Sequence, residues 1–491
     1  MGISRSVLAS FAVLAATGCS SASPVPLPGP PEGSSSAPEG SGDATLHSLV
    51  VSTGSLVPEF TSSNADYNIT SLTSLEAIQV TATTNDPKAT VTIQGAPAKS
   101  GAATSVKLAP REDISVVVTS GETTLTYKVN YVPTDMPAYT VTTTAQAGNE
   151  DILIAPGFTY LLVIDRSGAP LWYRTFPQQS VEDLQQHVLS SGNMYSAVIG
   201  TANPLGWTLG AAHVFDAQFH DVAQVQMLAH ADHGPLPAEA HDFMVLGDEH
   251  YVVETYLPRT IDMHAFNPAW SNEAPVMTCL VQEIDHGQVV FEWDSANDWS
   301  LYTDCNDPTN CKFGTSAISD YLHLNSIDID PTDNNFVFSF RHANAIVKVD
   351  RKTAQTIWTL GGKEDQFGLQ ADQIFSHQHH ARMHPDGTMT VFDNGNGLHQ
   401  SRALQLTLDQ VNHKVLNFDV IYEKPTAQAA TAFMGSVVPT DSSHYVIGWG
   451  GWLTMDLLPS VSEIMNGQPV WSLQFTAPAV FSYRALPISK L

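Results

Sequence analysis

From about residue 137 to its end, the chain repeats one pattern of apolar and polar positions. Each copy has an alternating strand, a turn with Asp or Gly, and a second strand that usually carries an aromatic residue. The turn forces a hairpin, and the aromatic ring fills the space between packed sheets. Six copies follow one another at intervals of roughly 50 to 70 residues, which is within the range of propeller blades. They cover 161–176, 212–226, 281–295, 346–360, 402–420 and 461–475. We therefore predict a six-bladed β-propeller over 137–491, which fits the hairpin unit better than a long array of sandwiches.

Residues 45–133 carry shorter runs of strict alternation, separated by turns and without helical periodicity. Such runs predict a small antiparallel β-sandwich, so the expected fold class of the whole chain is all-β. The segment LHSLVVSTGSLVPEF at 46–60, Tyr67 and TYKVNYV at 126–132 resemble the cadherin-like β-sandwich domain of bacterial surface proteins. This resemblance implies a spacer or adhesion module without catalytic residues.

The N-terminus has the pattern of an export signal. Arg5 precedes an apolar run from Val7 to Ala16, which is too short to span a membrane, and the run leads into Thr-Gly-Cys19. This pattern resembles a lipobox, which implies a signal peptide over 1–18 and a lipid on Cys19. The expected location is then the cell envelope, periplasmic or at the outer membrane, with ordinary secretion as the alternative. Residues 19–44 are rich in Ser, Pro and Gly and are expected to form a linker that buries no core.

Three further cysteines follow, and export makes a disulfide permissible among them. Cys305 and Cys311 bracket a turn-rich segment that could close into a small loop, whereas Cys279 stands alone. Three unpaired thiols are the alternative. No Cys-x-x-Cys pair is present, which argues against a zinc ribbon or a thioredoxin-like site.

Composition and charge narrow the possible partners. The 491 residues carry a formal net charge of -28, which would repel nucleic acid and an anionic membrane surface. We therefore expect no nucleic-acid partner and no membrane contact except through a lipid anchor. An anionic substrate would need a site with its own local positive charge. The oligomeric state is not indicated by the sequence.

Histidine is concentrated between about residues 321 and 402, among motifs that occur in a fixed order. These are His323-Leu324-Asn325-Ser326-Ile327, Ser339-Phe340-Arg341, Trp358-Thr359-Leu360-Gly361-Gly362, Gln378-His379, Phe392-Asp393-Asn394-Gly395 and Ser401-Arg402, with His241-Asp242 upstream. Together they resemble the motifs of bacterial arylsulfotransferases, and the resemblance extends more weakly over the whole propeller.

The resemblance implies that His379 is a nucleophile that becomes transiently sulfated, and that His241, His323 and Arg341 surround the transferred group. It further implies an aryl sulfate donor and a phenolic acceptor. We expect no cofactor and see no glycine loop for a nucleotide donor. Asn325 is a candidate for contact with the sulfate, although stabilising a turn is an equal alternative. Trp358, Gly361, Gly362, Asn394 and Gly395 are expected to be structural.

These residue types suit sulfuryl transfer. The transition state carries negative charge on peripheral oxygens, so positioning and cationic donors matter most. Arg offers a fixed fork of donors and stays charged. A neutral imidazole is a good nucleophile, and another histidine can protonate the departing phenolate and later deprotonate the incoming phenol.

Four alternatives remain open. His379 and His380 are neighbours whose side chains should point to opposite faces of a strand, so only one of them should face the axis. Three histidines could hold zinc, but no helical His-x-x-x-His pair is present and Arg341 would repel a cation. The propeller could instead be an idle binding module, or it could hydrolyse sulfate esters with water as the acceptor.

Overall fold

We describe the fold from a computed structural model of the chain. The described residues are 42–52, 56–69, 78–107, 113–130, 136–176, 178–423, 431–452 and 459–491. The predicted signal peptide, Cys19 and the linker up to residue 41 lie outside them. Among the helices that the structure describes, none has the length and apolar character needed to cross a membrane.

The N-terminal part is a β-sandwich, as the alternation predicted. Its strands are β1 (Leu46–Val51), β2 (Leu56–Val57), β3 (Asp66–Ile69), β4 (Ile78–Thr84), β5 (Thr90–Ile93), β6 (Ala96–Ala98), β7 (Ala103–Val106), β8 (Ile114–Ser120) and β9 (Thr123–Asn130). One sheet has the order β1-β4-β7 and the other β2-β3-β9-β8-β5-β6. The β3–β9 pair is parallel, unlike the other pairs, which are antiparallel. In β4 and β8 buried and half-buried positions alternate strictly, so one face of each strand forms the core.

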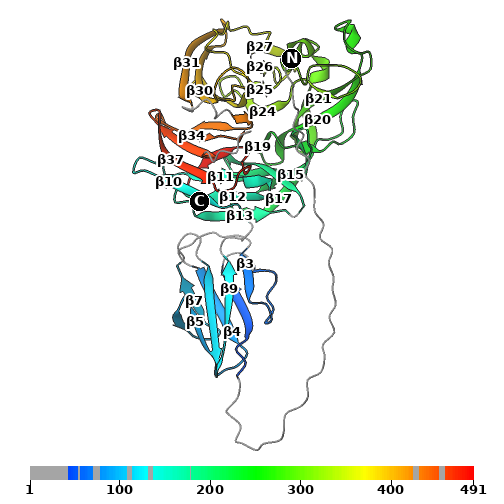
Figure 1. Cartoon of the computed structure of the whole chain (residues 1–491). Coiled ribbons are helices and arrows are strands. Elements are labelled where there is room, and N and C mark those ends of the chain that lie inside the picture. The colour runs from blue at the N-terminus through cyan, green and yellow to red at the C-terminus, as the bar shows by residue number, and fades with distance from the viewer. Residues whose placement is uncertain are drawn as a thin grey trace, which may run out of the picture. The chain divides into compact units, whose positions relative to one another are not determined.

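Six sheets of four or five strands follow, and they form the predicted propeller (Figure 1). Blade 1 contains β11 (Asp151–Ile154), β12 (Tyr160–Ile164), β13 (Pro170–Thr175) and β38 (Ala485–Ile488). Blade 2 contains β14 (Ser180–Leu189), β15 (Gly192–Ala202), β16 (Thr208–Phe215), β17 (Asp221–Val225) and the short β18 (Ala238–Glu239). Blade 3 contains β19 (Phe243–Gly247), β20 (His250–Ile261), β21 (Ala274–Asp285), β22 (Gln288–Asp294) and the short β23 (Ser319–Asp320).

The remaining three blades repeat the arrangement. Blade 4 contains β24 (Leu324–Ile329), β25 (Phe336–Phe340), β26 (Ala345–Val349) and β27 (Thr356–Gly361). Blade 5 contains β28 (His379–Met383), β29 (Thr388–Asp393), β30 (Arg402–Asp409) and β31 (Lys414–Glu423). Blade 6 contains β33 (Ser436–Pro439), β34 (His444–Gly448), β36 (Val461–Met465), β37 (Gln468–Phe475) and β10 (Tyr139–Thr143). A separate pair joins β32 (Thr431–Phe433) to β35 (Gly451–Trp452).

The ring is closed by strands from both ends of the propeller sequence. β38, the last strand of the chain, pairs with β11 and supplies the innermost strand of blade 1. β10, the first strand after the sandwich, pairs with β37 and supplies the outermost strand of blade 6. The innermost strands β14, β38, β33, β28 and β24 contact one another in that order, so they surround a common axis. Placing strands from the two ends of the segment in neighbouring blades closes the ring.

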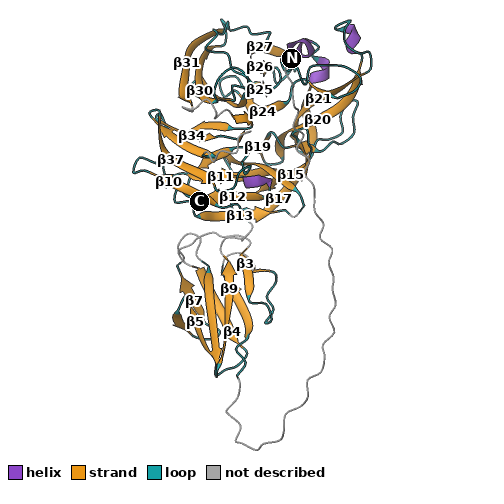
Figure 2. Ribbon diagram, in the orientation of Figure 1, coloured by secondary structure: helices purple, strands orange, loops and turns teal. Residues whose placement is uncertain are grey.

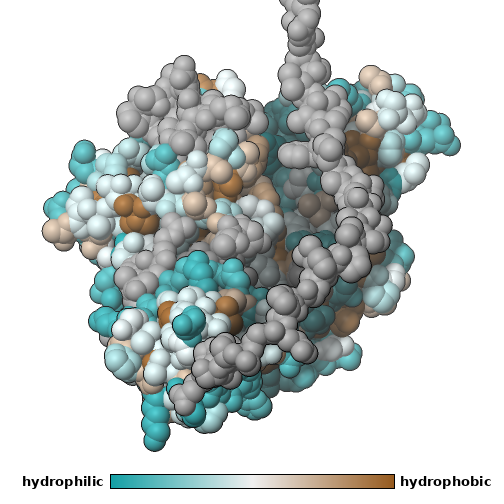
Figure 3. Space-filling model, turned by 60° about the horizontal axis from the view of Figure 1, so that its bottom comes forward, coloured by the Kyte–Doolittle hydropathy of each residue, from teal (hydrophilic) through white to brown (hydrophobic). Residues whose placement is uncertain are grey.

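The hairpins predicted from the repeat form the two outer strands of blades 1 to 5, and in blade 6 the hairpin β36–β37 is followed by β10 on its outer side. Their tryptophans Trp172, Trp293, Trp358 and Trp471 are all buried, because each fills the space between two blades. Helical structure within the described residues is confined to short turns such as α1 (Ser300–Asp304), which Figure 2 shows beside the orange strands. On the face visible in Figure 3, hydrophilic and hydrophobic residues are interspersed, as expected of a surface with many charged loops.

Candidate active site

The histidine-rich motifs meet at one face of the propeller. His241, His323 and His379 lie at the start of the innermost strands β19, β24 and β28. Arg341 follows β25 and lies in the turn to β26. Because neighbouring strands in a blade are antiparallel, the start of the innermost strand and the turn after the second strand fall at the same end of the blade. Residues that are distant in sequence are therefore brought together around the axis.

His241 is buried against a carboxylate. Its Nδ1 lies 2.7 Å from Oε2 of Glu239, and its backbone N–H donates to the same oxygen. Burial by itself lowers the pKa of His241, but the negative charges of Glu239 and Glu182 outweigh it and hold that pKa above its ordinary value. His241 is therefore suited to carry a proton and to donate it.

His323 is its neighbour, and the two ring centroids lie 4.8 Å apart. Nδ1 of His323 is 2.6 Å from Oδ2 of Asp320, to which it donates a hydrogen bond because a carboxylate can only accept. Burial, the nearby His241 and the guanidinium of Arg341 hold the pKa of His323 well below its ordinary value. His323 is therefore neutral, with Nε2 as a hydrogen-bond acceptor.

His379 is buried on the other side of Tyr483. The Tyr483 ring lies 5.4 Å from that of His241 and 6.4 Å from that of His379, between centroids. Nδ1 of His379 is 2.7 Å from Oδ1 of Asn394 and 3.0 Å from the carbonyl oxygen of His377. Burial and the charge of Arg341 hold the pKa of His379 well below its ordinary value, so its imidazole is neutral.

Arg341 supplies the positive charge that an anionic substrate needs. Its Nη2 donates to the carbonyl oxygen of Ala432 at 2.9 Å, and among the described residues it forms no ion pair with a carboxylate. Much of its donor capacity is therefore available to an anionic group. Its charge lowers the pKa of both His323 and His379.

Asn325 lies in β24, two residues after His323, and is fully buried. Its Nδ2 donates to the carbonyl oxygen of Gln378 at 2.7 Å, next to His379 in the chain. The backbone oxygen of Asn325 accepts from the Tyr483 hydroxyl at 2.9 Å. The structure thus gives Asn325 contacts that position the residues around the nucleophile candidate, and no contact in it tests the predicted approach to sulfate.

His379 and His380 face different surroundings. His380 lies at an irregularity of the β28–β29 pairing and has a positive φ of 52°. Its imidazole is in the field of Arg382, Arg484 and Asp242, whereas His379 is in that of Arg341, His241 and His323. The geometry therefore places His379, and not its neighbour, with the other predicted site residues.

A buried ion-pair network connects the innermost strands that carry the site residues. Arg484 donates to Asp183 at 2.9 Å and to Asp242 at 3.1 Å, and also to the backbone oxygens of His241 and Asn325. Arg382 donates to Asp242 at 2.7 Å. One guanidinium thus ties together the innermost strands of blades 1 to 4, because each of these strands or its start contributes one of the contacts.

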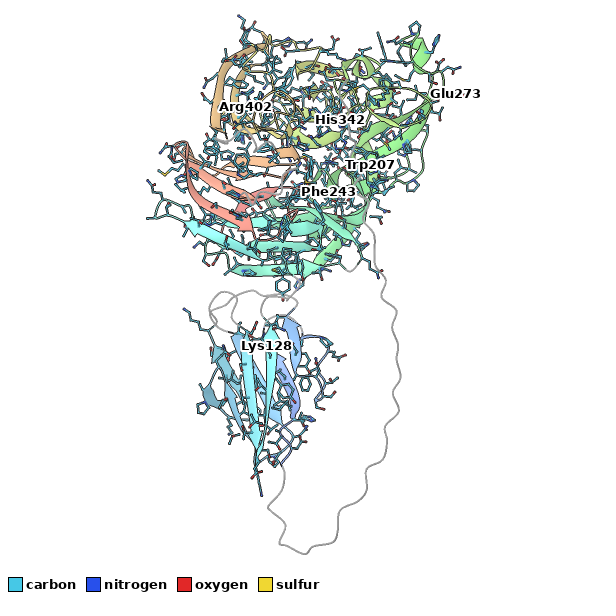
Figure 4. All side chains as sticks on the ribbon, viewed as in Figure 1. Lys128, Trp207, Phe243, Glu273, His342 and Arg402 are labelled. Atoms are coloured by element: carbon cyan, nitrogen blue, oxygen red, sulfur yellow. A yellow bond between two sulfur atoms is a disulfide. The ribbon has the colours of Figure 1, made fainter. Side chains whose placement is uncertain are left out.

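Two further histidines, His342 and His377, lie beside this group. The His342 ring lies 4.8 Å from His323, and Asp307 approaches both His342 and His377, at 3.9 and 3.4 Å. Figure 4 marks His342 among the side chains packed within the propeller and Glu273 at its rim. The structure joins Cys305 and Cys311 in a disulfide that closes the loop carrying Asp307, and Cys279 is buried and free.

Asp320, His323 and His342 could in principle hold a metal ion, since their ligand atoms lie within 4.8 Å of one another. However, Nδ1 of His323 donates to the Asp320 carboxylate and Nδ1 of His342 donates to the Asp320 backbone oxygen. Both nitrogens that face Asp320 therefore carry protons, which is the pattern of a hydrogen-bonded cluster rather than of ligands turned toward a cation.

Three side chains that hydrogen-bond to the site histidines were not predicted from the sequence as functional. Glu239 and Asp320 lie two and three residues before His241 and His323, and this short spacing is the only signal that could have indicated them. Asn394 belongs to the predicted Phe-Asp-Asn-Gly motif, but we expected it to shape a turn. Its contact with His379 depends on how blade 5 folds.

Two family models match parts of the chain. The family model described as arylsulfotransferase (ASST) matches residues 185–452, and the one described as cadherin-like β-sandwich domain matches 46–133. No curated protein sequence matches the chain.

Solved structures similar to the chain share little sequence with it. A protein of unknown function from Bacteroides caccae is 10% identical, with a TM-score of 0.43 over 70% of this chain and 100% of that one. A quinonprotein alcohol dehydrogenase-like protein from Bacteroides thetaiotaomicron is 11% identical, with a TM-score of 0.38 over 88% and 98%. Virginiamycin B lyase from Staphylococcus aureus is 10% identical, with a TM-score of 0.31 over 69% and 99%. These likenesses carry no inference about activity.

Proposed function

The chain belongs to the arylsulfotransferase family, and we propose that it moves a sulfuryl group from an aryl sulfate to a phenolic acceptor through a sulfated His379. The observation that carries this proposal is the meeting of His241, His323, Arg341 and His379 at one face of the propeller. A neutral imidazole beside an unpaired guanidinium suits attack on an anionic sulfate ester.

In the first half-reaction His379 forms a bond to sulfur while the bond from sulfur to the aryl oxygen breaks. The electron pair of that bond leaves with the aryl oxygen as a phenolate. Arg341 holds the sulfuryl oxygens, on which negative charge accumulates in the loose transition state. In the second half-reaction the oxygen of a phenol attacks the sulfur, and the bond from sulfur to His379 breaks.

His241 and His323 divide the proton transfer and hydrogen bonding between them. His241, whose pKa is raised, donates its proton to the departing phenolate and takes it back from the incoming phenol. His323 is neutral, because its pKa is lowered, and its Nε2 accepts the hydrogen bond of the incoming phenol as the phenol binds. The same hydroxyl then turns to His241, which takes its proton. No proton is gained or lost over the whole cycle, so the site needs no further acid or base.

The aryl ring is expected to lie against half-buried phenylalanines beside the site. Phe433 precedes Met434, whose N–H meets Nε2 of His379 at 3.1 Å. The Phe433 and Phe481 rings are 5.8 Å apart in an edge-to-face arrangement, and Phe158 lies 6.4 Å from Phe481. All three rings are half-buried: Phe433 ends β32, Phe158 ends a short 3-10 helix, and Phe481 lies in the loop before β38. Such rings favour stacking or edge contact with an aromatic substrate.

Export and lipid attachment at Cys19 belong to the same proposal. They are supported by the pattern of the first nineteen residues and would place the propeller outside the cytoplasm, where the disulfide between Cys305 and Cys311 can persist.

The proposal is tested by phenol release from a chromogenic aryl sulfate, with and without a phenolic acceptor. We expect release that the acceptor stimulates in the wild type and in His380→Ala, provided that His380→Ala remains folded. His379→Ala should abolish it. Release of free sulfate without an acceptor would instead indicate a hydrolase. No release from folded wild type with several donors would indicate an idle binding propeller.

A further inference from the structure

The side chain of Asn394 forms a hydrogen bond with the imidazole of His379. It is fully buried and lies just after β29, the strand that pairs with β28. Its Nδ2 donates to the backbone oxygens of Thr431 and Met434, both at 3.0 Å. Backbone oxygens can only accept hydrogen bonds, so the amide nitrogen must face them and Oδ1 must face His379.

This orientation determines the protonation of the imidazole. Oδ1 of Asn394 and the carbonyl oxygen of His377 both accept from Nδ1, so the proton of the neutral ring resides on Nδ1. On the other side of the ring, the backbone N–H of Met434 points at Nε2, at 3.1 Å. Since an N–H can only donate, Nε2 carries the lone pair. Asn394 contributes to both contacts, because it also binds the carbonyl of Met434.

We propose that Asn394 is a positioning residue that holds His379 in the tautomer with the proton on Nδ1, so that Nε2 is the atom that accepts the sulfuryl group. This inference rests on the proposed function and adds to it the atom that reacts and the side chain that selects this atom. Attack requires that Nε2 exchange the Met434 N–H for the sulfur atom.

The same contact stabilises the charge that develops during transfer. When Nε2 bonds to sulfur and the aryl oxygen leaves with its electron pair, the ring becomes a sulfated imidazolium, and Nδ1 keeps its proton. The positive charge is shared with Nδ1–H, where Oδ1 of Asn394 and the oxygen of His377 accept. A hydrogen bond that strengthens as charge develops contributes to the rate and not only to binding.

A neutral amide is better suited to this position than a carboxylate. The groups that face His379 from the other elements are Arg341 after β25, His241 before β19, His323 before β24 and Tyr483 before β38. None of these is an anion at neutral pH, so His379 stays unprotonated. A carboxylate at position 394 would attract a second proton to the ring and block Nε2 as pH falls.

The test compares Asn394→Ala, Asn394→Asp and Asn396→Ala in the full chain. Asn396 is a matched control, because its Nδ2 donates to the oxygen of Ala432 at 2.8 Å in the same segment, and no hydrogen bond joins it to His379. We expect Asn394→Ala to lower kcat by about 10- to 100-fold with little change in KM, as for loss of other outer partners of a reacting imidazole. Asn396→Ala should stay close to wild type.

The pH dependence of activity in Asn394→Asp distinguishes a positioning role from a purely structural role, which would leave this pH dependence unchanged. The new carboxylate should raise the pKa of His379, so the activity should decline on the acid side at a higher pH than in the wild type. The proposal would be overturned if kcat fell equally in Asn394→Ala and Asn396→Ala and if the acid side of the pH profile stayed unchanged in Asn394→Asp. Asn394 would then only anchor residues 431–434.

The tautomer can be read without any turnover. In protein with ¹⁵N-labelled histidine, the signals absent from His379→Gln identify the ring, and their shifts show which nitrogen carries the proton. We expect the proton on Nδ1 in the wild type and a mixed or reversed tautomer in Asn394→Ala. A proton on Nε2 in the wild type would contradict this inference, whereas the expected tautomer in an inactive wild type would overturn only the proposed function.

Discussion

The rings of His241 and His323 lie 4.8 Å apart in an edge-to-face arrangement, and their pKa values are shifted in opposite directions. The difference arises from their surroundings. His241 is bound to Glu239 and lies near Glu182. His323 is buried, and the positive charges of His241 and Arg341 act on it. Two equivalent side chains thereby acquire different protonation states at one pH, which allows one to act as an acid while the other accepts a hydrogen bond.

The first prediction concerns the pH dependence of phenol release from the donor. The step needs His241 protonated and His379 neutral. Since the pKa of His379 is well below its ordinary value, the rate should stay constant on the acid side of the ordinary imidazole range. It should fall as pH rises through the raised pKa of His241. Glu239→Gln removes the attraction and should move the alkaline limb to lower pH. The single-turnover rate measured against pH checks this.

Glu283→Gln is the matched control for that shift. Glu283 forms another carboxylate–histidine pair, with His250 at 2.7 Å, in strands that do not supply site residues. Its removal should leave the alkaline limb in place. If the alkaline fall in rate also stays at the same pH in Glu239→Gln, His241 is not the acid.

The second prediction concerns Arg341. Arg341→Met should lower kcat/KM by roughly 100- to 1,000-fold, because it removes the only cationic donor that we place on the sulfuryl oxygens. Arg341→Lys should recover only part of the loss, since an ammonium does not reproduce the planar fork. Steady-state kinetics with one donor and one acceptor measure both. Arg174→Met, a change of the same kind on the outer strand β13, should be near wild type, and a similar loss there would refute a specific role.

The third prediction concerns aryl recognition. Phe481→Ala should raise KM for aryl sulfates by about tenfold and affect two-ring donors more than one-ring donors, because the lost contact is with the ring. Phe176→Ala truncates a half-buried phenylalanine just after β13, at the outer edge of the same blade. It should leave KM unchanged. Equal KM values for Phe481→Ala and wild type would place the aryl ring elsewhere.

The fourth prediction concerns stability. Arg484→Met should destabilise the propeller by about 3 to 5 kcal/mol, because it removes the guanidinium that binds the buried carboxylate of Asp183 and leaves Asp242 with Arg382 alone. Urea-induced unfolding followed by tryptophan fluorescence measures the change. Arg174→Met breaks a partly exposed contact with Asp221 at 3.9 Å and should cost less than about 1 kcal/mol. Similar midpoints for the two variants would argue against the network as a stabilising element.

The sequence predicted the blades because the repeated hairpin is a local signal. A turn residue and an aromatic residue such as Trp172 or Trp471 occur within one short segment, and neither depends on distant parts of the chain. The closure of the ring was not predictable in this way. β38 joins blade 1 and β10 joins blade 6 through pairing between segments more than 300 residues apart. A strand of four residues such as β38 has too short a sequence pattern to indicate which strand it pairs with.

The site was predicted in part for a similar reason. Ordered motifs indicated His241, His323, Arg341 and His379, and the structure brings them together. Their partners Glu239, Asp320 and Asn394 were missed, because Asp and Glu are frequent near turns and only side-chain orientation distinguishes a partner from a solvated loop residue. The buried Arg484, near the end of the chain, lay outside every motif, although it contacts the backbone of both His241 and Asn325.

The central claim is that His379 carries the sulfuryl group, and the most direct test is the mass of the protein after mixing with an aryl sulfate in the absence of an acceptor. The account predicts a gain of one SO₃ group, located on the peptide that contains His379, present in His380→Ala, absent from His379→Ala and discharged when a phenol is added. Turnover of the donor by a wild-type protein that never gains this mass, or that gains it on another residue, would contradict the account.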